Sequence, residues 1–96
     1  MASVDTEYQL KIYVAGMTPD HQDDIVRLKR AMREYLGNSS LKVIDVMEQP
    51  HLADQDKILA TPTVVRALPM PMKKFIFDLG SIEKILIGMD LIKNGE

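Results

Sequence analysis

Cysteine is absent from this sequence, and its absence removes a whole class of chemistry. Thiol–disulfide exchange needs a thiolate that attacks sulfur, and structural disulfides and thiolate metal sites need the same side chain. Long apolar runs are lacking too, because none approaches the roughly 20 residues that a membrane-spanning helix requires. The first five residues also lack the charged and then apolar pattern of a secretory signal. We therefore expect a cytoplasmic protein without thiol chemistry.

A strong excess of one charge is missing as well. The 96 residues carry a net charge of −2 with 46% apolar side chains, which predicts one ordinary globular domain over residues 1–96. This balance does not suggest a nucleic-acid binder. One local cluster of basic residues is flanked by acids, so we interpret it as a solvated helix face. The cluster contains Arg27, Lys29, Arg30 and Arg33, and its acidic neighbours are Asp23, Asp24 and Glu34.

The patterns of catalytic and metal sites are also lacking. His21 and His51 are far apart in the sequence and neither belongs to a metal-ligand spacing. No glycine-rich phosphate loop and no Gly-x-Ser-x-Gly elbow occurs. We therefore expect no enzyme activity, no metal and no cofactor. The acidic residues form no convincing dyad and are expected to be solvated; they include Asp54, Asp56, Asp78, Glu83 and Asp90.

The sequence does contain a regular succession of strand-like and helix-like segments. Residues 8–14 alternate, which predicts a strand with one face in the core, formed by Tyr8, Leu10, Ile12 and Val14. Thr18-Pro19-Asp20 then supplies the cap, the first-turn proline and the acid that favour a helix start. Helical spacing gives this helix one apolar face, formed by Ile25, Leu28, Met32 and Leu36.

The second half of the chain continues the pattern. The near-continuous apolar run over residues 41–47 predicts a central parallel strand covered on both faces, and completes a βαβ unit. A short polar helix is predicted from Pro50 to about Lys57. Residues 63–68 and 72–78 predict an antiparallel hairpin joined by Pro69-Met70-Pro71.

The corner Thr61-Pro62-Thr63 follows a helix-like segment and precedes a strand-like one. It is similar to the place where thioredoxin-like folds keep their active-site proline. Together with the order of elements, it predicts an α/β protein with the thioredoxin-like order βαβαββα. Such a scaffold without cysteine indicates a binding module.

The last segment, residues 82–93, has two periodicities. A helix has an apolar stripe, but Ile87 and Leu91 lie opposite it and Gly88 interrupts it at a cost of about 1 kcal/mol relative to alanine. Over residues 85–92 the side chains also fit the two-residue period of a strand, and the isoleucines of the segment favour a sheet. The residues alone therefore leave two alternatives open. The segment is either a buried helix with an imperfect apolar stripe, which composition favours, or a segment with two conformations of similar stability.

Several stretches form a pattern that runs in order across nearly the whole chain. The two most specific are Lys57-Ile58-Leu59-Ala60-Thr61-Pro62-Thr63 and Leu86-Ile87-Gly88-Met89-Asp90-Leu91. Others are residues 10–16, 41–46 and 50–53. Together these stretches resemble the KaiB family of circadian clock proteins.

The resemblance implies a non-enzymatic regulator that converts between two folds. One is a thioredoxin-like monomer, and the other is a ground state of order βαββααβ, in which residues 85–92 form a strand and the chain self-associates as a tetramer or dimer. In the family the monomer binds the ring-shaped ATPase KaiC, competes there with the thioredoxin-like domain of the kinase SasA, and can hold KaiA inactive. The implied role is modulation of a circadian or stress-response timing system. A stably thioredoxin-like adaptor that does not switch is the alternative.

Residue roles follow from the resemblance by position. Those implied to face a KaiC-type ATPase are Pro50, Asp54, Gln55, Lys57, Pro71 and Lys74, and Lys42 is implied to contact KaiA. Gly88 and Asp90 are expected to set the balance between the folds. The sequence differs from the family pattern at Met70, Phe75 and Phe77, which suits a divergent paralogue or a relative from a bacterium without KaiA.

The double variant Gly88→Ala, Asp90→Arg is predicted to favour the thioredoxin-like monomer. Removing the glycine lowers the cost of a helix by about 1 kcal/mol, and arginine near the helix C-terminus replaces an unfavourable charge by a favourable one. Far-UV circular dichroism should show more helix, and size-exclusion chromatography should show less self-association. An unchanged helical signal with unchanged self-association would contradict the prediction.

Overall fold

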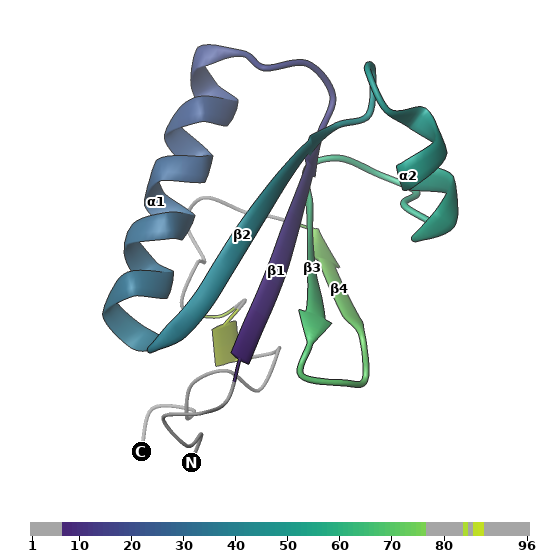
Figure 1. Ribbon diagram of the computed structural model, residues 1–96. Helices are drawn as coiled ribbons and strands as arrows, with labels where there is room; N and C mark the ends of the chain where they lie inside the picture. The colour runs from purple at the N-terminus through teal and green to yellow at the C-terminus, as the bar shows by residue number, and fades with distance from the viewer. Residues whose placement is uncertain (1–6, 77–83, 85, 88–96) are drawn as a thin grey trace.

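The computed structural model describes residues 7–76 together with residues 84, 86 and 87 (Figure 1). Its elements are β1 (Glu7–Val14), α1 (Pro19–Tyr35), β2 (Asn38–Asp45), α2 (Pro50–Gln55), β3 (Thr63–Leu68) and β4 (Lys73–Ile76). Every strand and helix predicted within residues 7–76 is present. The bounds of β3 match the prediction, whereas α2 ends at Gln55, before the predicted Lys57.

β1 is an inner strand of the four-stranded sheet, whose order is β2-β1-β3-β4. It runs parallel to β2 and antiparallel to β3, and β3 is antiparallel to β4. The βαβ unit and the hairpin are therefore confirmed. The predicted central position of residues 41–47 is wrong, because β2 lies at one edge of the described sheet. β2 begins with the polar residues Asn38, Ser39 and Ser40, and Ile44 is its only fully buried residue, as suits an edge strand.

α1 covers one face of the sheet (Figure 1). Its predicted start is confirmed, since the Thr18 hydroxyl accepts a hydrogen bond from the His21 N–H at 3.2 Å and Pro19 occupies the first turn. The predicted apolar faces of α1 and β1 are both confirmed, because they pack together in one buried cluster. This α1 cluster contains Ile25, Leu28, Met32 and Leu36 of the helix, and Tyr8, Leu10, Ile12 and Val14 of the strand.

Asp24 of α1 does not follow the prediction of a solvated acid. It is only 5% exposed, and its burial raises the pKa of the carboxyl above the ordinary value. The acids beside the basic cluster are therefore not all part of a solvated helix face.

α2 lies over the opposite face of the sheet from α1 (Figure 1). The buried residues of this second cluster are Tyr13, Ile44 and Val65, with Val46, Leu52, Ala53 and Ile58 packed against them. The prediction that β1 buries only one face is therefore wrong, since Tyr13 points away from the α1 cluster and is 1% exposed. Towards its C-terminal end, β1 is covered on both sides.

Part of the segment with two periodicities lies within the described residues. Lys84, Leu86 and Ile87 have helical backbone, and Leu86 is fully buried in the α1 cluster. This agrees with the helical alternative at these three positions. Gly88 and Asp90, predicted to set the balance between folds, lie outside the described residues. None of the described helices is long and apolar enough to cross a membrane.

Leu28→Ala is predicted to lower the free energy of unfolding by about 2–5 kcal/mol, because it leaves a cavity in the α1 cluster. Leu28 has no exposed surface, whereas Val26 on the same helix is 53% exposed. Val26→Ala is the matched control and should change the free energy by less than about 0.5 kcal/mol. Urea denaturation followed by circular dichroism measures both values. Equal losses in the two variants would contradict the packing of α1 on the sheet.

Candidate functional site

α2 is a short helix that cannot be stable on its own. It has six residues, its N-cap Gln49 makes no side-chain capping hydrogen bond, and none of its residues is fully buried. Isolated helices need roughly 12–15 residues before they become even marginally stable in water. Leu52 and Ala53 are half-buried against the second cluster. The position of α2 therefore depends on side chains of the sheet.

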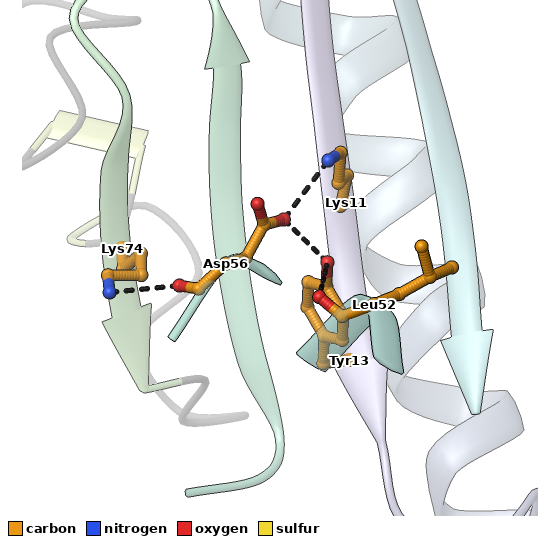
Figure 2. A network of polar contacts seen from close by, with 5 residues as sticks. All are labelled: Lys11, Tyr13, Leu52, Asp56 and Lys74. Atoms are coloured by element: carbon orange, nitrogen blue, oxygen red, sulfur yellow. Dashed lines mark hydrogen bonds and ion pairs between the residues drawn. The ribbon is translucent and has the colours of Figure 1, made fainter. Parts of the chain in front are cut away.

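Asp56, directly after α2, connects this helix to β1 (Figure 2). Its Oδ2 atom accepts a hydrogen bond from the Tyr13 hydroxyl at 2.5 Å and forms an ion pair with the Lys11 Nζ at 3.0 Å. The Tyr13 oxygen also lies 3.2 Å from the Leu52 carbonyl oxygen. Tyrosine has only one hydroxyl proton to donate. The Asp56 carboxylate is closer than the Leu52 carbonyl and is charged, so it is the stronger of the two acceptors.

The ion pair between Lys11 and Asp56 is partly shielded from water. Their side chains are 30% and 15% exposed, respectively. A pair of this kind is screened less than one on the open surface. We therefore expect this contact to hold α2 on the sheet more firmly than a typical surface ion pair would.

The same contacts shift two protonation equilibria. Burial acts to raise the pKa of Asp56, but hydrogen bonds from Tyr13 and Lys11 and the charges of Lys11 and Lys74 outweigh it, so this pKa lies below its ordinary value. Burial, reinforced by the hydrogen bond to Asp56 and by its negative charge, raises the pKa of Tyr13 above its ordinary value. At neutral pH the carboxylate is therefore charged and the phenol keeps its proton.

Lys74 of β4 stabilises the end of α2 from the other side. Its Nζ donates hydrogen bonds to the backbone carbonyl oxygens of Asp56 at 3.0 Å and Lys57 at 3.2 Å (Figure 2 shows the first). A cation at the last carbonyls of a helix also interacts favourably with the negative end of the helix dipole. Asp56 thus connects three elements, through its carboxylate to β1 and through its carbonyl to β4.

A shallow groove lies beside the contacts that Asp56 and Lys74 make at the end of α2. Its volume is about 200 Å³, and two of its apolar side chains are strongly exposed, Leu59 at 98% and Ile76 at 67%. Exposed apolar side chains next to charged ones are a common feature of protein-binding surfaces. The groove is lined by Lys57, Ile58, Leu59, Ala60, Thr63, Lys74, Phe75 and Ile76.

The groove offers binding contacts, and the side chains described in its lining form no recognisable catalytic arrangement. Among the described residues, its lining contains no histidine or carboxylate, and the Thr63 hydroxyl donates a hydrogen bond to the Ala60 carbonyl at 2.5 Å. Across the described part of the chain, no group of three His, Asp or Glu side chains is placed to hold a metal ion. The arrangement is suited to docking a macromolecule.

The structure brings together most of the residues predicted to face a KaiC-type ATPase. Pro50, Asp54 and Gln55 are exposed on α2, and Lys57 is the second residue after the helix ends. Lys74 reaches the Lys57 carbonyl from β4. Of these five residues, Lys57 and Lys74 line the groove, and the other three lie along α2.

Two predicted residues lie elsewhere. Pro71 is in the β3–β4 connection, at the far end of the hairpin from α2 (Figure 1), where its carbonyl accepts a hydrogen bond from the Arg66 Nη2 at 2.6 Å. Lys42 is exposed on β2, at the opposite edge of the described sheet from β4. The groove therefore includes neither of them.

Sequence reasoning missed the residues that anchor the site. The interpretation of Asp56 as a solvated acid is wrong, because its carboxylate is the centre of the contacts with Lys11 and Tyr13. One signal was available in the alternation of β1, since Tyr13 is an aromatic side chain on the otherwise polar side of that strand. Leu59 and Ile76 gave no signal of their exposure.

Comparison with known proteins identifies the family. The family model described as the KaiB domain matches residues 11–91. The chain belongs to the KaiB family. The circadian clock oscillator protein KaiB of Synechococcus sp. (strain RCC307) is 50% identical over 86 residues, which cover 88% of this chain and 78% of that protein. The protein of the same name from Trichodesmium erythraeum (strain IMS101) is 48% identical over 93 residues, or 96% of this chain and 89% of that protein.

Solved structures establish the fold. The N-terminal domain of Synechococcus elongatus SasA matches with a TM-score of 0.70 at 19% identity, covering 98% of this chain and 93% of that chain. The germline-specific thioredoxin Deadhead of Drosophila melanogaster matches with a TM-score of 0.69 at 17% identity, covering 90% of this chain and 84% of that chain. The predicted thioredoxin-like fold is therefore confirmed.

Asp56→Asn is predicted to lower the free energy of unfolding at pH 7 by about 1–3 kcal/mol, because it removes the charge that Lys11 and Tyr13 stabilise. The Asp56 pKa is lower in the folded chain than its ordinary value. Its contribution is therefore fully present above the ordinary carboxyl pKa of about 4 and is lost as the pH falls through the folded value. Urea denaturation at a series of pH values should show the difference between wild type and variant shrinking in acid.

Asp54→Asn is the matched control for this prediction. Asp54 is exposed on the same helix, so its substitution should change the free energy of unfolding by less than about 0.5 kcal/mol. If Asp56→Asn lost the same free energy at every pH, the ion pair would not be the cause of the loss.

Proposed function

We propose that this chain is a non-enzymatic regulator of a circadian or stress-response timing system, and that it binds a KaiC-type ATPase ring in the cytoplasm. The observation that carries the proposal is the KaiB family match over residues 11–91, with relatives named circadian clock oscillator proteins. The binding surface is the exposed side of α2 together with the groove. Pro71, at the far end of the hairpin, would extend this surface along β4.

The geometry of the groove suits this role. Leu59 and Ile76 supply apolar area that a partner can desolvate, and the Lys57 charge favours one orientation of the partner. The contacts of Asp56 and Lys74 hold α2 in place before binding. A surface that is already ordered loses less conformational entropy when it binds, so its affinity is higher.

The likeness to the SasA N-terminal domain supports competition for one docking position. Two proteins with the same fold can present equivalent surfaces to the same ring. KaiA, where the organism has it, would use a different surface. Lys42 lies at the sheet edge opposite β4, so an ATPase that covers the groove would leave Lys42 accessible.

We also propose that binding is gated by a change of fold. In the ground state, a tetramer or dimer, residues 85–92 would form a strand, and Gly88 and Asp90 would disfavour the helical alternative. If only the thioredoxin-like monomer binds, the apparent affinity falls with the fraction of chains in that form, and refolding limits the association rate. Slow binding of this kind introduces a delay into a regulatory system.

The alternative is an adaptor that keeps its thioredoxin-like fold at all times. It is favoured by the helical backbone of Lys84, Leu86 and Ile87 and by the burial of Leu86 in the α1 cluster. A protein of this kind would bind at a rate set by encounter with the ring. The two hypotheses therefore differ in kinetics.

A binding time course against the KaiC-type ATPase of the same organism tests the proposal. The natural chain should bind slowly and the Gly88→Ala, Asp90→Arg variant quickly, because the variant is already in the binding fold. Fast and equal binding by both chains would favour the adaptor. Absence of binding by both would refute the proposed partner.

The substitution Leu59→Ser tests the proposed docking surface independently of the proposed change of fold. In the background of the double variant it should raise the dissociation constant by at least about tenfold, as expected for a well-buried apolar contact. The association of this triple variant with the ATPase should stay as fast as that of the double variant. The control is Val26→Ser on α1, which lies away from the groove and should change the affinity less than about twofold. An equal effect of both substitutions would place the interface elsewhere.

A further inference from the structure

The basic cluster of α1 has a second feature that the proposed function does not use. Lys29 and Arg33 line a groove of about 310 Å³ between the last turns of α1 and the start of β2. Figure 1 shows this end of α1 beside the first residues of β2. The other described lining residues are Met32, Gly37, Ser39, Ser40 and Leu41, so the described part of the lining contains two cations, two serines and no acid.

The acids that flank the cluster do not neutralise these two cations. On a helix, side chains three and four residues apart are neighbours. Arg27 has Asp23 and Asp24 at these spacings, and Arg30 has Glu34.

Lys29 and Arg33, by contrast, have no acid at either spacing. They are four residues apart, so their own charges repel each other. Neither forms an ion pair with any described residue that the structure records. The interpretation of the whole cluster as a solvated helix face therefore fits Arg27 and Arg30 better than Lys29 and Arg33.

The strand side of this groove contributes the hydroxyl of Ser39. The side chain of Glu7, which is close in register, points to the other face of the sheet. Leu41 packs against the α1 cluster, so Ser39, two residues earlier on β2, lies on the same face of the sheet. Glu7 is close in register, since it pairs with Asn38. Its side chain, however, is on the opposite face, where it accepts a hydrogen bond from Gln9. The groove is therefore positively charged on its helical wall and carries a hydrogen-bond donor on its strand wall.

We propose that this groove binds the phosphate group of a soluble phosphate monoester. Arginine and lysine beside a hydroxyl are the usual donors to such a group, and arginine can contact two of its oxygens at once. The bound dianion would also relieve the repulsion between Lys29 and Arg33. The volume of about 310 Å³ is within the range of small-molecule sites and leaves room for an organic part beside Met32 and Leu41.

Titrations with inorganic phosphate and with glycerol 3-phosphate, followed by ¹⁵N–¹H NMR at constant ionic strength, test this site. Saturable shifts are expected at Lys29, Arg33 and Ser39. The variant Lys29→Gln, Arg33→Gln should raise the dissociation constant by at least about tenfold, as expected when charged hydrogen bonds are lost. The spectrum of the variant also reports whether it is folded.

The matched control is Arg27→Gln, Arg30→Gln, which removes the same net charge from the same helix. It should change the dissociation constant less than about twofold, because only long-range electrostatics differ. Equal weakening in both double variants, or shifts that never saturate, would overturn the proposal. Tighter binding of glycerol 3-phosphate than of inorganic phosphate would show that the organic part contacts the groove, and equal binding would assign recognition to the phosphate alone. The residues differ from those of the α2 surface, so failure to bind an ATPase would not affect this result.

Discussion

The burial of β1 on both faces is the constraint on which the described structure depends. One face of this strand packs in the α1 cluster, and the other carries Tyr13 into the second cluster. β2 and β3 occupy its two edges, so its hydrogen-bonding groups are paired on both sides. α1 and α2 are both positioned relative to this strand. The location of the partner surface therefore follows from how β1 is covered.

The two faces of β1 are covered in different ways. The α1 face is an extensive apolar interface, which needs no specific polar contacts. The α2 face is smaller, and a six-residue helix cannot bury enough apolar area to hold itself there. The polar contacts of Asp56 compensate for this deficit. Because such contacts are directional, they fix the orientation of α2 more narrowly than apolar packing alone would.

Local sequence patterns predicted most of the fold. The alternation in β1, the capping residues of α1 and the apolar face of that helix are all determined by neighbours in the sequence. The hairpin was also predictable, because prolines interrupt two runs of strand-forming residues. For these elements, short-range physical rules and tertiary packing favour the same structure.

The errors concern properties that depend on residues far apart in the chain. The apolar character of residues 41–47 could not distinguish an inner strand from an edge strand, since strand order is decided by pairing between distant segments. Asp56 and Lys11 are 45 positions apart, so neither residue alone indicated their ion pair. The candidate site was predicted in part: the resemblance selected exposed residues around α2, but the side chains that hold α2 in place were not recognised.

The position of Lys74 has a consequence for how interfaces in this family are mapped. A lysine ammonium group has three hydrogen-bond donors, and in this chain two of them already contact carbonyls at the end of α2. For the third donor, no partner is recorded among the residues that the structure describes. A substitution that removes the ammonium would therefore release the helix as well as any intermolecular contact, and loss of an interaction at this position would not by itself identify a residue that touches the other protein.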